Sequence, residues 1–129
     1  MQVSQDPWIP LQETWVTPRG RWEGRIRFGP TSDWFSGHFE ECPLLPGVAL
    51  LALVVETVKR QGQKQGRVLE FSSFSRVRFK RFVFPDEELH ISIAGMPSGN
   101  KARLDFLVAC HGETVAQGEL DIYEEGFRE

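Results

Sequence analysis

One uninterrupted apolar run, residues 48–55, stands near the middle of the chain. A Pro-Gly pair precedes it, and proline is well accommodated in the first turn of a helix. The run continues into a basic pair and reaches Gly62, a combination typical of a helix end. We therefore predict one helix over Val48–Arg60, apolar on every side of its first two turns. The apolar run is well short of the ~20 residues that span a membrane, so the rest of the chain must surround this helix.

Alternating apolar and polar positions predict strands on both sides of this helix. Before it, residues 21–28 place tryptophan, isoleucine and phenylalanine between charged residues, as a strand with one buried face does. After it, residues 68–74 are a weaker candidate, and four segments alternate clearly: 76–82, 89–94, 102–109 and 114–123. Short turns between consecutive strands make them antiparallel. The pattern predicts an α+β fold in which one curved antiparallel sheet wraps around the helix.

The two ends of the chain do not show this alternation. Residues 1–18 carry three prolines and predict an irregular arm, and residues 124–129 predict a charged, frayed tail.

A chain of 129 residues predicts a single domain over 1–129. The net charge of −3 argues against a general nucleic-acid binder. The chain starts without a secretory leader pattern, and Cys42 and Cys110 are too few for a disulfide framework, so we expect a cytoplasmic protein with free thiols.

Two motifs resemble those of a known family. The letters G-H-F at 37–39, followed by C-P-L-L-P-G-V at 42–48, resemble the active-site segment G-H-F-P-x-x-P-x-x-P-G-V of 3-hydroxyacyl-acyl-carrier-protein dehydratases of the FabA/FabZ type. Residues 76–89 resemble that family's R-F-x-R-P-V-x-P-G-D-x-L segment, and the similarity continues to 115–120. It covers most of the chain from about Phe28 onward. The resemblance implies the hot-dog fold, a sheet wrapped around a central helix, which agrees with the hydrophobic pattern.

The resemblance also implies roles for individual residues. His38 would take the proton α to a thioester carbonyl, because an imidazole pKa near ~6.5 suits a base at neutral pH. The N–H of Gly47 would hold the carbonyl, because unpaired N–H groups at a helix start carry partial positive charge. The family's carboxylate, supplied by the partner chain of a dimer, stands fourteen residues after the histidine, where this chain has Ala52. Glu56 lies one turn further on the same helix face and is the candidate acid.

The function implied is dehydration of a 3-hydroxyacyl thioester, carried by acyl carrier protein or coenzyme A, in fatty acid or polyketide-type biosynthesis. We expect a homodimer that uses no cofactor or metal and has no membrane span. Two alternatives stay open. The first is an acyl thioesterase of the same fold, using a carboxylate from Glu40, Glu41 or Glu56. The second is a non-catalytic module that binds an acyl chain or a carrier protein. We expect substrate to contact Phe39, Leu44, Val48 and Ala52.

A basic cluster follows the helix, and its spacing alternates basic residues with phenylalanines. We expect Phe79 and Phe82 to face the core and the basic side chains to face water. An acidic acyl carrier protein is the natural partner for such a cluster. Its members are Arg76, Arg78, Lys80 and Arg81.

The remaining candidate chemistry is weaker. A nucleophilic pair of Cys42 with His38 is conceivable, but a small apolar loop residue is the better interpretation of Cys42. His38-Phe-Glu40 fits the H-x-E pattern of zinc deaminases, whose P-C-x-x-C partner is absent. No other histidine and cysteine positions have the spacing of zinc ligands. We interpret His90, in a strand, and His111, in a turn, as structural or exposed residues.

Overall fold

The computed structural model describes residues 9, 11–30, 32–35, 44–94 and 101–125. Within these ranges the chain forms one helix of eighteen residues, one short 3-10 helix and one six-stranded sheet. The elements, in chain order, are β1 (Leu11–Val16), β2 (Trp22–Arg27), η1 (Asp33–Phe35), α1 (Gly47–Lys64), β3 (Leu69–Phe79), β4 (Glu88–Ile93), β5 (Lys101–Cys110) and β6 (Glu113–Glu124).

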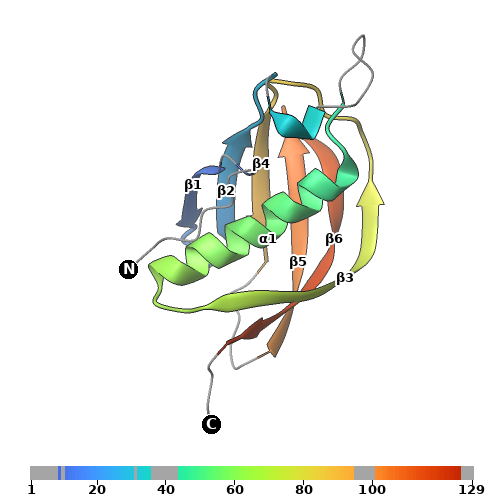
Figure 1. Cartoon of the computed structure of the whole chain (residues 1–129). Coiled ribbons are helices and arrows are strands. Elements are labelled where there is room, and N and C mark those ends of the chain that lie inside the picture. Colours follow the sequence, from blue (N-terminus) through green and yellow to red (C-terminus); the bar gives the residue numbers. More distant parts are fainter. Residues whose placement is uncertain (1–8, 10, 31, 36–43, 95–100, 126–129) are drawn as a thin grey trace.

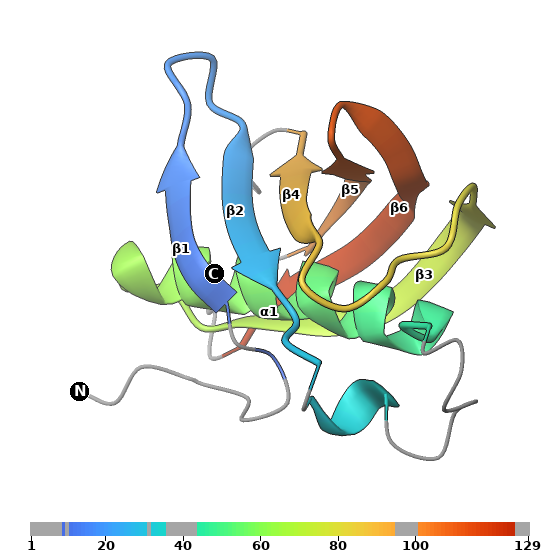
Figure 2. The ribbon, with the colours of Figure 1, turned by 90° about the horizontal axis from the view of Figure 1, so that it is seen from above.

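The sheet is antiparallel throughout and curves around α1 (Figure 1). Its strand order is β1-β2-β4-β5-β6-β3, so β1 and β3 are the two edges. The strands rise from one side of α1 when the molecule is viewed from above (Figure 2). This architecture confirms the predicted α+β fold. The predicted strands 89–94, 102–109 and 114–123 agree with β4, β5 and β6 to within two residues.

The helix extends beyond its predicted end, to Lys64 rather than Arg60. Gly62 lies inside the helix, at a point where Leu69 packs closely against it; an added Cβ would stand 2.7 Å from Leu69 Cδ1. The chain leaves the helix at Gly66, whose φ of +73° is the left-handed conformation that glycine adopts easily. The glycine that ends the helix is therefore the second of the two glycines in this segment.

The prediction of an irregular arm over residues 1–18 is wrong for its second half, because β1 forms there and pairs with β2. The pairing is supported by contacts across the two strands. Arg25 Nη2 lies 2.7 Å from Glu13 Oε1, and Trp15 Nε1 donates to Glu23 Oε1 at 3.1 Å. The register shifts between Leu11 and Glu13, so the sequence of β1 lacks the clean alternation that would have marked it as a strand.

The two strands expected at 68–74 and 76–82 form one long edge strand, β3. Its pairing with β6 shifts between Ser75 and Arg78, and Arg76 has a φ of +53°. Such a bulge re-aims the side chains beyond it. After Phe79 the chain leaves the sheet, and Val83 accepts a hydrogen bond from the N–H of Leu45, which precedes α1.

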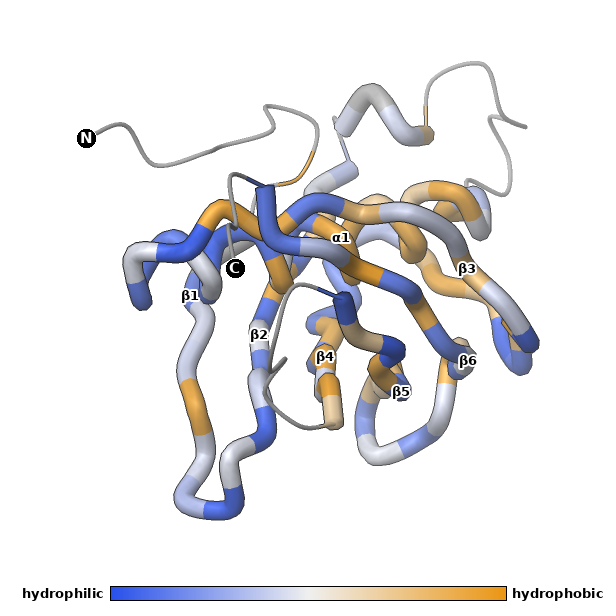
Figure 3. Tube along the Cα trace, turned by 90° about the horizontal axis from the view of Figure 1, so that it is seen from below, coloured by the Kyte–Doolittle hydropathy of each residue, from blue (hydrophilic) through white to orange (hydrophobic). Residues whose placement is uncertain are grey.

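The core lies between α1 and the concave face of the sheet. Figure 3 shows apolar positions on α1 and alternating along the strands that it covers. The helix is not enclosed on every side as predicted: Val48 is 61% exposed, and Leu51, Ala52 and Val55 are only partly buried. These four residues, spaced three and four apart, form an apolar stripe along α1. Among the described residues, no helix has the length and apolar character needed to cross a bilayer.

Candidate active site

An apolar cavity of about 390 Å³ lies at the N-terminal end of α1. The segment before the helix, the first turn of the helix and the end of β3 enclose it. One basic side chain, Arg81, reaches an otherwise apolar lining. The lining residues are Leu44, Leu45, Pro46, Gly47, Leu50, Phe79, Arg81 and Phe82. Leu44 was predicted to contact substrate and Gly47 to hold a carbonyl, and both lie here.

The first turn of α1 supplies the polar part of this cavity. Pro46 is the N-cap residue, with φ −68° and ψ 149°, and it offers no side-chain hydrogen bond to the helix. The first turn also contains no acidic residue. Ala49 N–H donates to Pro46 O at 2.9 Å, which leaves the N–H of Gly47 ahead of the first bonded turn. The partial positive charge of the helix start is therefore not neutralised by a side chain of α1.

Phe79 covers the Cα of Gly47. An added Cβ on Gly47 would lie 2.8 Å from Cζ of Phe79 and 3.0 Å from its Cε1. Contacts that short essentially do not occur, so only glycine fits beneath this ring in its present position. The ring is itself 51% exposed and borders the cavity. The prediction that Phe79 faces the core is thus wrong: the bulge in β3 turns it toward the helix start.

The wall segment, residues 80–87, closes the other side of the cavity. Val83 is buried, whereas Phe82 is 68% exposed and lines the cavity rather than the core, contrary to the prediction. Arg81 holds this segment by a bidentate pair with Glu87, at 2.8 and 3.1 Å. The hydrogen bonds from Arg81 lower the pKa of Glu87 to about 2, with a smaller contribution from the N–H of Phe84.

Glu56, the candidate acid, is buried and 5% exposed. Its Oε1 lies 3.9 Å from Nη2 of Arg60, which is 8% exposed. At 1.5 Å per residue, Glu56 lies about 13 Å along the helix axis from Gly47. One protomer therefore does not bring these two groups together. Ala52, which is partly buried, lies between them on the apolar stripe.

The predicted residues His38, Phe39, Glu40, Glu41 and Cys42 lie outside the described residues. Their roles remain predictions.

The basic cluster divides into two kinds of residue. Arg76, Arg78 and Lys80 are exposed, and Arg76 and Arg78 border an open groove with Arg21. Arg81 differs because its guanidinium is engaged by Glu87, and its side chain is only 23% exposed. Arg81 therefore stabilises the wall segment, and the other three basic residues of the cluster are exposed.

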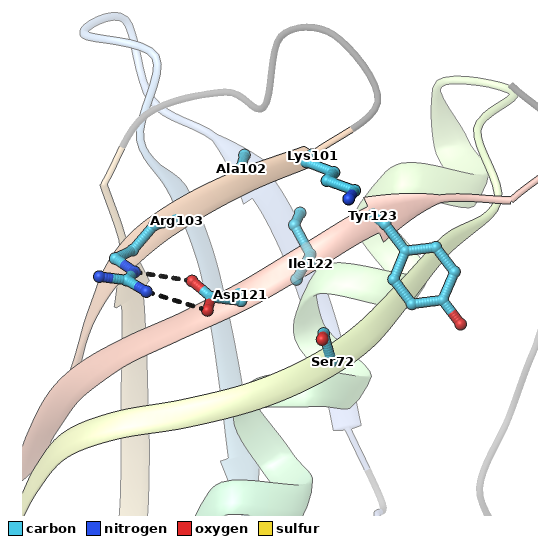
Figure 4. A pocket seen from close by; sticks show the side chains of 7 residues that line it. All are labelled: Ser72, Lys101, Ala102, Arg103, Asp121, Ile122 and Tyr123. Carbon is cyan, nitrogen blue, oxygen red and sulfur yellow. Dashed lines mark hydrogen bonds and ion pairs between the residues drawn. The ribbon is translucent and has the colours of Figure 1, made fainter. Parts of the chain in front are cut away.

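A larger groove, of about 780 Å³, opens over β3, β5 and β6 (Figure 4). Two of its charged groups are already paired: Arg103 Nε donates to Asp121 Oδ1 at 2.8 Å, and Ser73 Oγ also donates to Asp121, to Oδ2 at 3.1 Å. No nucleophile and base meet among its described lining residues, Ser72, Lys101, Ala102, Arg103, Asp121, Ile122 and Tyr123. We therefore place the candidate active site at the start of α1.

A second polar group lies on β2 and β4, where Glu23 accepts hydrogen bonds from Trp15 and Ser92 and contacts His90 Nε2 at 3.2 Å. The serine and the histidine each contact a different oxygen of this carboxylate, and no hydrogen bond joins these two described side chains. This arrangement does not activate a serine nucleophile.

Comparison with protein families decides the relationship. The ApeI-like family model, described as ApeI dehydratase, matches residues 15–119. The chain belongs to this family. Among curated relatives, the 3-hydroxyacyl-[acyl-carrier-protein] dehydratase FabZ of Bacillus subtilis is 30% identical over 97 residues, covering 68% of this chain and 66% of that protein. FabZ of Cupriavidus metallidurans is 30% identical over 102 residues, covering 67% and 68%. The chain thus spans just under two thirds of the Bacillus subtilis relative.

Solved structures show the same fold. A chain of the dehydratase heterocomplex ApeI:P from Xenorhabdus doucetiae matches with a TM-score of 0.70 and 25% identity, covering 89% of this chain and 97% of that one. The protein smu.793 of Streptococcus mutans, solved with acetyl CoA, matches with a TM-score of 0.69 at 11% identity, covering 100% and 96%. The hot-dog fold and the FabA/FabZ-type resemblance are both confirmed.

Proposed function

We propose that this ApeI-like chain dehydrates a 3-hydroxyacyl thioester carried by acyl carrier protein or coenzyme A. The observation that carries the proposal is the apolar cavity at an uncapped helix start. An acyl thioester has an apolar chain and a carbonyl that gains negative charge when its α-proton leaves. The cavity suits the chain, and the Gly47 N–H suits the developing enolate oxygen. The relatives named FabZ and ApeI support this reaction class.

In this mechanism His38 removes the α-proton, Gly47 N–H stabilises the oxyanion, and Glu56 protonates the departing hydroxyl. The α-carbon electron pair forms the new double bond as water leaves. Because Glu56 lies about 13 Å along the helix from Gly47 in the same protomer, we propose that it acts in the site of a second copy. The thioester is unchanged by this reaction, and no free thiol is released.

We propose that the active form is a homodimer. Two features support a second copy as the partner: the apolar stripe of Val48, Leu51, Ala52 and Val55, and the open edge of β3. An unpaired edge strand next to exposed apolar residues is a ready surface for association. The ApeI:P structure is a heterocomplex. An active form that requires a related but different chain as its partner would therefore contradict this proposal.

The docking surface for the carrier would comprise Arg76, Arg78 and Lys80, beside the end of β3 that borders the cavity. Acyl carrier proteins are acidic, and coenzyme A carries phosphates, so either carrier would be attracted by this charge. Such a role fits a proposed place in fatty acid or polyketide-type biosynthesis.

The experiment is to incubate the purified chain with a 3-hydroxyacyl thioester and to follow both the enoyl thioester and free thiol. We expect the enoyl product without thiol, and we expect His38→Ala to abolish it. Free thiol without the enoyl product would instead indicate a thioesterase. That second candidate is favoured by the fold shared with a hypothetical thioesterase of Streptococcus pneumoniae solved with coenzyme A, at 13% identity and a TM-score of 0.66. Tight binding with neither product would indicate a non-catalytic module.

A further inference from the structure

Three potential metal ligands meet at one end of the sheet, outside the candidate active site. Glu87, at the end of the wall segment, faces Cys110, the last residue of β5, and His111 in the turn that follows. One ligand atom from each side chain lies within 4.8 Å of the others. We propose that these three residues form a binding site for Zn²⁺.

The spacing of the ligand atoms is close to what zinc requires. Cys110 Sγ lies 3.6 Å from Glu87 Oε2, and His111 Nε2 lies 3.8 Å from the same oxygen. Zinc bonds of ~2.0–2.3 Å in a tetrahedral arrangement place neighbouring ligand atoms roughly 3.3–3.6 Å apart. The sulfur–oxygen separation therefore already lies in this range, and the nitrogen–oxygen separation needs to contract by only a few tenths of an ångström. Sulfur, imidazole nitrogen and carboxylate oxygen are all established zinc ligands.

The site combines a buried sulfur with an accessible nitrogen. Cys110 is 1% exposed, whereas the side chain of His111 is 69% exposed and that of Glu87 is 18% exposed. An ion can enter from the His111 side and leave its fourth position to water. The sulfur–zinc bond forms as the thiol S–H bond breaks, and the proton passes to solvent.

Arg81 is the main competitor for the carboxylate, because its Nη2 lies 2.8 Å from Glu87 Oε2. A carboxylate has about four acceptor positions, so one oxygen can accept from a guanidinium and also bind a metal. The charges balance: Zn²⁺ and Arg81 bring +3, Glu87 and the Cys110 thiolate bring −2, and Glu113, whose Oε1 lies 3.8 Å from Arg81 Nε, brings −1.

The turn that presents His111 allows a clean test. His111 and Gly112 have φ of +51° and +80°, the conformation of a two-residue hairpin turn that favours asparagine followed by glycine. His111→Asn therefore removes the imidazole while suiting the turn better than histidine does. A loss of zinc binding in this variant cannot be attributed to a weakened fold.

The experiment titrates the metal-free full chain with Zn²⁺ by calorimetry, and with Co²⁺ while the absorbance of a thiolate–cobalt bond is followed. We expect one ion per chain, a cobalt–thiolate band, and a rise in the thermal midpoint with Zn²⁺. His111→Asn and Cys110→Ser should each weaken Zn²⁺ binding by more than ~10–100-fold. That range is the loss of metal affinity seen when only a residue hydrogen-bonded to a metal ligand is replaced.

Two matched controls complete the test: Cys42→Ser and His90→Asn remove a thiol and an imidazole that are not among the three proposed ligands, and both variants should bind Zn²⁺ as the unmodified chain does. The proposal is overturned if no stoichiometric binding occurs, if Cys110→Ser keeps the cobalt–thiolate band, or if Cys42→Ser abolishes it. Binding is measured without substrate, so failure here leaves the proposed dehydratase activity untouched.

Discussion

The two halves of α1 differ in polarity and in exposure to solvent. The N-terminal half is apolar, carries the exposed stripe beginning at Val48, and opens onto the cavity through Gly47. The C-terminal half is polar but buried, and it contains Glu56, Thr57, Arg60 and Gln61. Thr57 donates a hydrogen bond to Leu53 O at 2.8 Å, so its hydroxyl is satisfied within the helix. The first end thus offers a backbone N–H beside an apolar cavity, whereas the second end buries polar side chains, among them the ion pair of Glu56 with Arg60.

This difference accounts for the kinds of side chain found at positions 52 and 56. Ala52 lies on the apolar half, where a small side chain leaves the stripe continuous. Glu56 lies where Arg60 can accompany its burial, because a buried charge is tolerated only when paired. A change at either end should therefore disturb a different property of the protein.

The largest effect is expected from Gly47→Ala. The new Cβ would meet the ring of Phe79, and displacement of either group would disturb the cavity at the Gly47 N–H. A shift of about 1 Å in a site of this kind costs roughly 10² in rate. We expect kcat/KM for the 3-hydroxyacyl thioester to fall by at least about 10², while the unfolding midpoint changes little because alanine suits a helix.

The matched control is Gly29→Ala, since a Cβ at Gly29 meets nothing within 4 Å. It should keep full activity. Adding Phe79→Leu to the Gly47→Ala variant should restore part of the rate, because the smaller side chain relieves the contact. Unchanged turnover in Gly47→Ala would refute the role of this helix start.

At the other end of the helix, Glu56→Gln should affect both stability and turnover. The change removes the charge of one partner in a buried ion pair with Arg60 and should cost about 1–3 kcal/mol, measured by urea unfolding. Loss of the acid should lower kcat by on the order of 10².

Arg60→Met separates these two effects. It breaks the same pair but keeps the carboxylate, so it should cost similar stability with a smaller loss of kcat. Equal losses of kcat in Glu56→Gln and Arg60→Met would show that Glu56 acts only through the pair.

A smaller and more selective effect is expected from Phe79→Ala, which uncovers Gly47. The half-exposed ring should contribute only about 1 kcal/mol of burial. The wider cavity should raise the kcat/KM ratio of branched over short acyl thioesters by about tenfold. Phe71→Ala, on the same strand but away from the cavity, should leave that ratio unchanged. An unchanged ratio in Phe79→Ala would mean that the ring does not limit access to the site.

The sequence was sufficient for the helix and most strands because their periods of hydrophobicity are strong. It did not reveal β1, whose register shift removes the alternation, nor the true helix end, since Gly62 accommodates Leu69 within the helix and Gly66 is the glycine that ends it. Local patterns cannot report contacts made by distant residues.

The same limit applied to the candidate site. The motif around Gly47 was recognisable, but the position of Phe79 depends on a bulge three residues earlier, near Arg76. The opposite charges of Arg81 and Glu87 are compatible with a pair. Nothing in their separation along the sequence, however, places Cys110 beside them. Glu87 and Cys110 are brought together only by the folding of β4 against β5.

The smallest effect is expected away from both ends of the helix, at Asp121 on the outer face of the sheet. Hydrogen bonds from Arg103, then from Ser73, lower the pKa of Asp121 below its usual value. Its ionised form therefore stabilises the fold above the unfolded-state pKa of ~3.9, and this stabilisation is lost as the pH falls below that value. Asp121→Asn should lower the urea midpoint only slightly at pH ~7, since the pair is exposed and screened. The difference from the unmodified chain should shrink as the pH falls through the lowered folded-state pKa and the carboxyl protonates. A loss of stability as large as that of Glu56→Gln would show that the buried polar groups in the C-terminal half of α1 contribute no more to stability than this exposed pair does.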